Sequence, residues 1–131
     1  MVDFKSLEPK IKKLAEKYNL SLIVLFGSQA TGALHSKSDV DIAILGINSL
    51  DIIKISSDFS SIFKREDVEV VDLRNASPTL MFCVLRDGKI LYEKEKETFL
   101  VWKLYAIRIW RETAWLRDLR DKKLIEWTKT V

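Results

Sequence analysis

The segment LFGSQATGALHSKSDVDIAIL, residues 25–45, constrains the fold of this chain more than any other. One apolar run ends in Gly27 and Ser28, and after ten further residues Asp39 and Asp41 lie inside a second apolar run. Side chains two residues apart on a strand point to the same side, so both aspartates would leave one face. Two carboxylates this close repel each other unless a cation lies between them. The pattern therefore predicts two neighbouring strands that share a cation-binding edge.

Hydrophobic periodicity predicts how the rest of the chain is organised. Helices are expected over 7–18, 50–63, 78–85 and 95–128, the last bent near 121–123, and strands over 20–26, 38–45, 67–73 and 89–93. Ser49 is expected to cap the second helix, and Pro78 to take the first position of the third. This order favours an α/β (α+β) fold: a small mixed, largely antiparallel sheet, helices on one face, and a long C-terminal helical segment. The other face would be open beside Asp39 and Asp41.

Length and composition suit one globular domain. The 131 residues are 47% hydrophobic and 31% charged. We expect a single domain over 1–131, with a catalytic core over about 20–93 and a helical segment over about 95–128. The charged N-terminus and the short apolar runs predict neither a signal peptide nor a membrane span. Cys83 is the chain's one cysteine, and a buried reduced thiol in a cytoplasmic protein is the interpretation.

The net charge of +3 is concentrated near the C-terminus. Residues 94–131 carry ten Lys and Arg against six Asp and Glu, a difference of +4. Such an excess can favour an acidic partner or RNA, and a solvated helix face accounts for it equally well. Because no RNA-recognition motif accompanies the charge, RNA binding is not expected.

The strand expected over 67–73 offers a third carboxylate, either Glu69 or Asp72. If the valines on either side of Glu69 pack under helices, Glu69 points to the same side as the two aspartates. Asp72 would lie near the strand end, where a capping or turn role is expected. Glu69 is therefore favoured, and it could act as a general base that takes the proton from an attacking hydroxyl.

These residue types suit phosphate chemistry. Oxygen ligands that converge from a rigid strand suit Mg²⁺ or Mn²⁺. Gly27 lets the backbone approach a ligand, while exposed N–H groups and the Ser28 hydroxyl can hold phosphate oxygens. A metal and a phosphate cradle on one sheet edge are the minimum equipment for phosphoryl or nucleotidyl transfer, because the metal neutralises the charge that develops during the reaction.

Gly27-Ser28, ten residues, and Asp39-Val40-Asp41 resemble the GS-x10-DxD signature of the minimal nucleotidyltransferases, a family of the polymerase-β-like superfamily. Ser38, directly before the first aspartate, is also typical. The segment VDLRNASPTLMFCVLRDGKILYE, 71–93, is similar to the antitoxin branch, whose members are paired with HEPN-domain toxins. The resemblance covers about residues 20–93.

This resemblance implies a minimal nucleotidyltransferase fold in which Asp39 and Asp41 bind two Mg²⁺ ions. Glu69 would take the position of the third carboxylate and metal ligand, which is more usually Asp. Gly27, Ser28 and Ser38 are the nucleotide-binding residues that it implies for ATP. It also implies transfer of AMP to a tyrosine hydroxyl of a HEPN RNase toxin, which blocks the RNase.

The loop between the signature residues departs from the family in one respect. Positions 29–31 read Gln-Ala-Thr where many relatives carry an arginine, so one phosphate contact is expected to be missing. His35, the chain's one histidine, could touch the nucleotide, but a solvated loop residue is the favoured interpretation.

Two alternative functions stay open. One is nucleotidyl transfer to a small-molecule hydroxyl, although enzymes of that type usually carry an extra substrate domain that this chain is too short to supply. The other is a non-catalytic antitoxin that acts by binding alone.

The C-terminal segment is expected to form an interface. A continuous helix over 95–128 would be about 50 Å long at a rise of about 1.5 Å per residue, so part of it should overhang the domain. Trp115 and Trp127 with neighbouring arginines have the composition of an interface. We expect this segment to contact the toxin or a second copy of the chain, which would give a homodimer.

Overall fold

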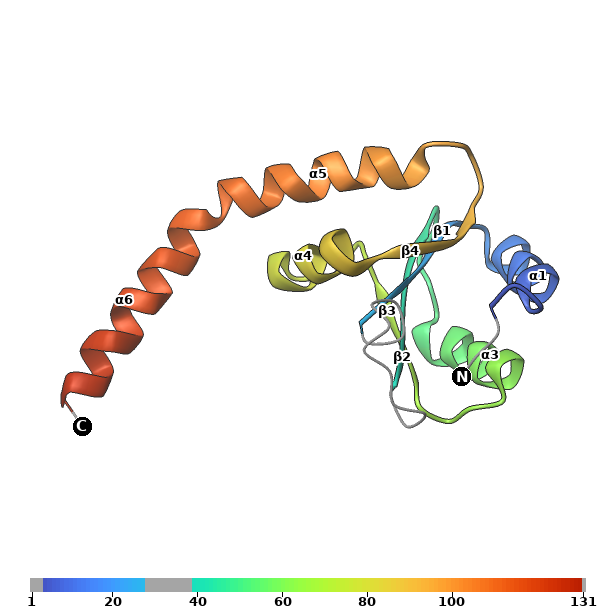
Figure 1. The fold of residues 1–131 in the computed structure, drawn as a ribbon, viewed down its shortest axis with the longest axis horizontal. Helices are drawn as coiled ribbons and strands as arrows, with labels where there is room; N and C mark the ends of the chain where they lie inside the picture. Colours follow the sequence, from blue (N-terminus) through green and yellow to red (C-terminus); the bar gives the residue numbers. More distant parts are fainter. Residues whose placement is uncertain (1–3, 28–38, 131) are drawn as a thin grey trace.

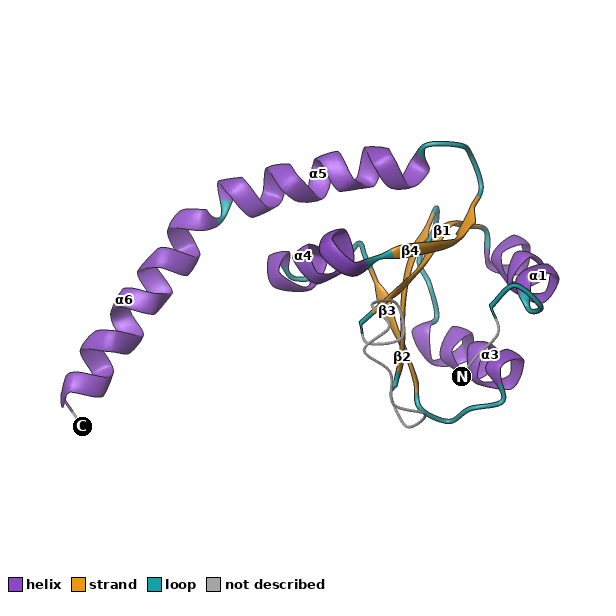
Figure 2. Cartoon of the chain, viewed as in Figure 1, coloured by secondary structure: helices purple, strands orange, loops and turns teal. Residues whose placement is uncertain are grey.

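The computed structural model describes residues 4–27 and 39–130 (Figures 1 and 2). Their helices and strands follow in the order α1 Glu8–Tyr18, β1 Leu20–Phe26, β2 Val40–Gly46, α3 Ile52–Phe63, β3 Val68–Asp72, α4 Pro78–Asp87, β4 Lys89–Glu93, α5 Thr98–Glu112 and α6 Ala114–Thr130. This order agrees with the one predicted from hydrophobic periodicity up to β4, after which two helices take the place of the one predicted. Among these residues, no helix combines the length and apolar character needed to cross a lipid bilayer.

Four strands of the described residues form one mixed sheet in the order β3-β2-β1-β4. The central strand β1 is antiparallel to both of its neighbours, β2 and β4. Strand β3 lies at the edge and runs parallel to β2. The prediction of a small mixed sheet that is largely antiparallel around a central strand is therefore confirmed.

Helices cover both faces of the sheet, which corrects the prediction that they would cover one (Figure 2). Helices α1 and α3 pack on one face, where Ile23 and Ile42 are buried. Helices α4 and α5 pack on the other, against Val24 and Ala43. The reason lies in β1, where every residue except Ser21 is buried. A strand that is apolar on both sides must be covered on both sides.

Capping residues set where two of the helices begin. Asp51, not the predicted Ser49, caps α3: its extended backbone lets the side chain accept a hydrogen bond of 3.2 Å from the Lys54 N–H. Helix α4 begins at Pro78, as predicted, and the Ser77 hydroxyl oxygen accepts from the Leu80 N–H at 3.2 Å.

Cys83 lies on α4 and is partly exposed, which corrects the prediction of a buried thiol. The buried positions of this helix are Met81 and Val84. Successive residues of an α-helix are rotated by about 100° around its axis, so the Cys83 side chain points away from the side of α4 that Met81 and Val84 bury. It forms no disulfide.

The C-terminal segment consists of two helices that meet at Thr113, not one helix bent near 121–123 (Figure 1). The Thr113 hydroxyl donates to the carbonyl of Ile109 at 2.7 Å, a bond from side chain to backbone that bends helices. Helix α5 packs on the sheet through Phe99, Trp102 and Ala106, whereas α6 buries no residue and projects away from the sheet. The predicted overhang is confirmed.

Candidate active site

Strand register places Asp41 at the centre of the candidate site. Asp41 pairs with Phe26, the last residue of β1, and on its other side with Glu69 of β3. Asp39 comes directly before β2, two residues from Asp41. Three neighbouring strands therefore bring the end of the first apolar run and the predicted carboxylates to one edge of the sheet.

The predicted carboxylates share one face of the sheet. Val40 and Ile42 are buried toward α1 and α3, so Asp39 and Asp41, at alternate positions, belong to the α4 and α5 face. In β3, the valines on either side of Glu69 pack toward α1 and α3 in the same way. The prediction that Glu69 shares a face with the two aspartates is confirmed, and so is the alternation of side chains along β3 from which it was inferred.

Gly27 brings the backbone of the β1 end against the Asp41 carboxylate. Its φ of +74° lies in the left-handed region, which residues with side chains rarely adopt. A Cβ atom at this position would lie 2.3 Å from Asp41 Oδ2. Only a glycine leaves room here for both the turn of the chain and the carboxylate.

The three carboxylates interact unfavourably with one another. Asp39 and Glu69 are exposed, whereas Asp41 is partly buried. Burial raises the pKa of the Asp41 carboxyl above its ordinary value, and the negative charges of Glu69 and Asp39 raise it further. A cation bound between these groups would remove the repulsion.

The carboxylates fit a metal whose ligands come partly from the substrate. Within residues 4–27 and 39–130, no group of three or more His, Cys, Asp or Glu side chains is arranged to hold a metal ion by itself. Mg²⁺ commonly binds through one or two carboxylates together with substrate phosphates and water. Asp39 and Asp41, with Glu69 beside them, match that type of donor set.

The other predicted site residues divide into two groups. Asp72 has the predicted turn role, since its carboxylate accepts from the Arg74 N–H at 3.0 Å and its carbonyl from the Asn75 N–H at 3.1 Å. Ser28, Ser38, His35 and positions 29–31 lie outside the described residues.

The prediction from sequence missed Arg65 and Asp67, which lie between α3 and β3. The guanidinium of Arg65 donates to both carboxylate oxygens of Asp67, from Nε at 2.7 Å and from Nη2 at 2.5 Å. The Val40 N–H donates to the Asp67 carbonyl at 3.0 Å, which places this pair beside the start of β2. Its sequence signal was an Arg-x-Asp stretch just before the third carboxylate.

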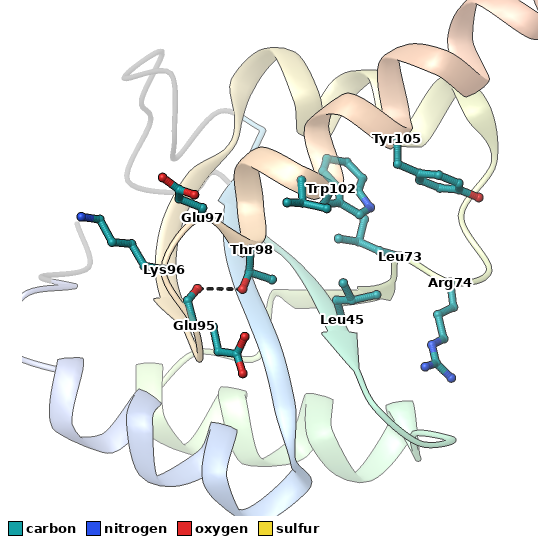
Figure 3. Close-up of a pocket in the computed structure, with 10 residues that line it drawn as sticks. Leu45, Leu73, Arg74, Glu95, Lys96, Glu97, Thr98, Trp102 and Tyr105 are labelled. Carbon is teal, nitrogen blue, oxygen red and sulfur yellow. Dashed lines mark hydrogen bonds between the residues drawn. The ribbon is translucent and has the colours of Figure 1, made fainter.

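A cavity of about 720 Å³ lies at the opposite end of β2, between the sheet and the first turns of α5 (Figure 3). Leu45, Leu73 and Trp102 form part of its apolar lining, and Arg74 and Tyr105 lie at its edge. Leu45 is near the carboxyl end of β2, whereas Asp41 is near the amino end. The cavity is therefore separate from the carboxylates.

Comparison with known proteins gives a consistent set of relatives. The family model described as polymerase beta, nucleotidyltransferase matches residues 9–97. Protein adenylyltransferase MntA of Shewanella oneidensis is 40% identical over 105 residues, which cover 72% of this chain and 72% of that protein.

Two solved structures are also similar. A crystal structure of a toxin–antitoxin with AMP-PNP has a TM-score of 0.79 and 31% identity, and covers 90% of this chain and 98% of that one. The structure of a tri-AMPylated Shewanella oneidensis HEPN toxin in complex with its MNT antitoxin has a TM-score of 0.75 and 28% identity, and covers 94% and 99%.

Proposed function

Because the chain belongs to the polymerase-β nucleotidyltransferase family and, within it, to the MntA-like protein adenylyltransferases, we propose that it is an antitoxin that transfers AMP from ATP to a tyrosine hydroxyl of a partner HEPN RNase toxin. The modification inactivates the RNase. The position of Asp41, between Gly27 and Glu69 and on one face with Asp39, carries this proposal. We further propose that residues 1–131 act as one domain in the cytoplasm.

Asp39, Asp41 and Glu69 are the proposed metal ligands, with two Mg²⁺ ions bound together with ATP. When bound, the metal neutralises the charge that develops on the α-phosphate and on the leaving pyrophosphate. The raised pKa of Asp41 supports this assignment, because its causes are burial and the negative charges of Glu69 and Asp39, which a bound cation would offset. Gly27, with Ser28 and Ser38, would bind the triphosphate.

The transfer forms one bond and breaks one. The tyrosine oxygen attacks the α-phosphorus, so the oxygen–phosphorus bond forms while the bond from the α-phosphorus to the oxygen bridging to the β-phosphate breaks. Pyrophosphate leaves with that bridging oxygen. Glu69, which is exposed at the sheet edge, takes the proton of the attacking hydroxyl.

The partner toxin is proposed to bind the α5–α6 arm, defined here as residues 98–130. Large apolar side chains stay exposed along it, among them Trp115 at 63% and Trp127 at 64%. The direction of the arm is held at its bend, where the Arg117 guanidinium lies 3.3 Å from the centroid of the Trp110 ring and Trp110 stacks on Phe82 of α4. Exposed apolar surface on a helix whose direction is fixed by side-chain contacts suits a protein interface. A homodimer through the same arm is the competing outcome.

Labelled ATP tests this function. The chain, the purified partner RNase and ATP labelled in the α-phosphate are incubated with Mg²⁺, and the expected result is label on a tyrosine of the partner and loss of RNase activity. The variant carrying Asp39→Ala and Asp41→Ala should transfer no label and leave the RNase active. Neutralisation by this variant at normal expression would mean that binding alone suffices, and label on a small hydroxyl compound instead of on protein would favour small-molecule transfer.

A further inference from the structure

We propose that the cavity at the start of α5 is a binding site for a small organic carboxylate with an aromatic or branched aliphatic body. The body would lie on three apolar side chains, those of Leu45, Leu73 and Trp102, and the carboxylate would pair with the Arg74 guanidinium. The cavity lies at the opposite end of β2 from Asp41, so this inference does not depend on the function proposed above.

The size and lining of the cavity are those of a small-molecule site. Its volume is about 720 Å³, within the range of about 300–1,000 Å³ that is usual for such sites. Leu73 and Trp102 are buried and Leu45 is half-buried, whereas Val101 and Tyr105 of α5 leave apolar surface exposed on one wall. Ligand sites are typically apolar cavities of this kind with a few polar groups at the edge.

Hydrogen bonds and packing hold the walls of the cavity in place. The Leu73 N–H donates to the Ile44 carbonyl at 2.9 Å, which fixes Leu73 beside β2. At the start of α5, the Thr98 hydroxyl donates to the Glu95 carbonyl at 2.7 Å (Figure 3). The buried Trp102 anchors the same helix on the sheet. The cavity is therefore formed in the absence of a ligand, and binding requires little rearrangement.

Arg74 supplies an available cation at the edge of the cavity. Its Nη2 atom donates to the Ile47 carbonyl at 2.9 Å, and its backbone N–H donates to the Asp72 carboxylate at 3.0 Å, so side chain and backbone are both held. A guanidinium has five N–H groups, and no carboxylate within residues 4–27 and 39–130 forms an ion pair with this one. Its remaining N–H groups can therefore donate to the carboxylate of a ligand.

The charges around the cavity favour one orientation and one class of ligand. Arg74 and Tyr105 lie at one end of the cavity, whereas Glu95 and Glu97 lie at the other (Figure 3). Lys96 comes from the same end, but its side chain points away from the cavity. An anionic group is therefore repelled from the glutamates and attracted to the arginine. One guanidinium matches the single charge of a carboxylate better than the charge of about −2 on a phosphate monoester.

Three probes of the same shape test this site: 3-phenylpropanoate, 3-phenylpropan-1-ol and 3-phenylpropylamine, which end in a carboxylate, a hydroxyl and an ammonium group. Each is titrated into the full-length chain, and the nuclear magnetic resonance signals of the tryptophan indole N–H groups report where it binds. Arg74→Gln and Arg74→Lys are compared with the wild type, and Val101→Asp places a negative charge on the exposed wall. Arg111→Gln is the matched control, because it removes an exposed arginine from the last turn of α5.

We expect the carboxylate probe to move the Trp102 signal with a dissociation constant of about 1–10 mM. The alcohol and the amine should bind about five-fold more weakly, because neither gains the ion pair. Arg74→Gln should bind the carboxylate and the alcohol equally, whereas Arg74→Lys keeps the charge and should keep the preference. Val101→Asp should weaken binding of the carboxylate about ten-fold through repulsion between like charges. Arg111→Gln should bind all three probes as the wild type does.

Four results would overturn the inference. Two of them are equal affinity for the carboxylate and the alcohol in the wild type, and an unchanged preference for the carboxylate in Arg74→Gln. The third is a Trp102 signal that stays in place up to about 20 mM of the carboxylate probe. The fourth is movement of the Trp115 and Trp127 signals alone, which would mean that the probes bind the exposed surface of the arm.

Discussion

At the scale of single residues, Gly27 and Asp41 depend on each other. The left-handed backbone of Gly27 brings the chain to the point where a Cβ atom would lie 2.3 Å from Asp41 Oδ2. Asp41 is held there by strands on both sides, so its carboxylate cannot withdraw without leaving the row that it forms with Glu69. The glycine thus sets how close the backbone at the end of β1 lies to the Asp41 carboxylate.

Gly27→Ala should reduce AMP transfer about a hundred-fold or more, because the new methyl group displaces the Asp41 carboxylate from its proposed metal-binding position. The positive φ adds a cost of about 1 kcal/mol to folding. Steady-state transfer assays and urea denaturation measure the two effects.

Gly46→Ala is the control for this substitution. Its Cβ would lie 2.7 Å from Leu50 Cδ2, so a side chain must also shift, but at the far end of β2. We expect some loss of stability and transfer within a few-fold of the wild type. Equal transfer by Gly27→Ala and Gly46→Ala would contradict the role assigned to Gly27.

Asp41→Asn should make the metal-free chain more stable, because it removes a partly buried charge that two like charges oppose. The expected rise in melting temperature is on the order of a few °C in the presence of EDTA. Mg²⁺ should reduce this difference in melting temperature, because it is expected to stabilise the wild type more than the variant. Thermal denaturation with EDTA and with Mg²⁺ measures both, and a variant that melts below the wild type in EDTA would argue against the repulsion.

At the scale of elements, two groups of side-chain hydrogen bonds join neighbouring helices. The Tyr18 hydroxyl and the Lys17 ammonium both donate to Asp58, which joins the end of α1 to the middle of α3. The second contact is the bend between α5 and α6, where Arg117 donates to the Trp110 carbonyl at 2.7 Å and to the Thr113 hydroxyl at 2.8 Å. Each contact joins two helices through hydrogen bonds in which one group is charged: Asp58 accepts in the first, and Arg117 donates in the second.

Tyr18→Phe should lower the free energy of unfolding by about 1 kcal/mol at pH 7, since the Asp58 carboxylate loses a hydrogen bond. The bond from Tyr18, with Lys17, holds the pKa of Asp58 below its ordinary value of 3.8. A carboxyl whose folded pKa is lowered contributes stability above the unfolded value, and that stability is lost as the pH falls through the folded value.

The difference in the free energy of unfolding between Tyr18→Phe and the wild type should therefore be the same at pH 7 and at pH 5, and it should become smaller below about pH 4. Urea denaturation across this range measures it. Tyr105→Phe, which removes a hydroxyl from a half-exposed position on α5, should show no such trend. A difference that grows in acid would refute the assignment.

Arg117→Ala should loosen the bend while the sheet and its helices stay intact. The substitution removes the contact with the Trp110 ring and two hydrogen bonds at the bend. We expect faster amide hydrogen exchange over residues 110–117 and little change elsewhere, as measured by mass spectrometry. Arg120→Ala, on the exposed surface of the same helix, is the control, and equal exchange in the two variants would mean that Arg117 does not hold the bend.

At the scale of the whole molecule, the site and the arm have different structural support (Figure 1). The carboxylate edge is built on strands that two layers of helices hold from both faces. The far half of the arm, α6, buries none of its residues, and its exposed apolar side chains include Trp115, Leu119 and Trp127. The catalysis proposed for the carboxylates and the partner binding proposed for the arm should therefore be separable by substitution or by truncation.

A chain that ends at Glu112 should fold with nearly unchanged stability, within about 0.5 kcal/mol, because α6 contributes no buried surface to either core. It should bind the partner RNase much more weakly and fail to neutralise it at equal concentration. Thermal denaturation and calorimetric titration with the partner measure the two results. Wild-type affinity in the truncated chain would exclude α6 from the interface.

Local pattern alone determined much of this protein. Strand alternation predicted that Asp39, Asp41 and Glu69 share a face, because successive side chains of any strand must point to opposite sides. Pro78 predicted the start of α4, because its fixed φ and missing N–H suit the first helical turn. These features depend only on residues that are close together in the sequence, so the sequence is enough to predict them.

Only the tertiary structure decided which surfaces the helices cover and which groups meet. Three features depend on contacts between elements or on a single rotamer. They are the helices on both sides of β1, the bend at Thr113, and the contact of Arg65 with Asp67 beside Asp39. Such contacts are selected by the packing free energy of the whole chain, which no short stretch of residues encodes. The face shared by the carboxylates could therefore be predicted from neighbouring residues, whereas the groups that surround them could not.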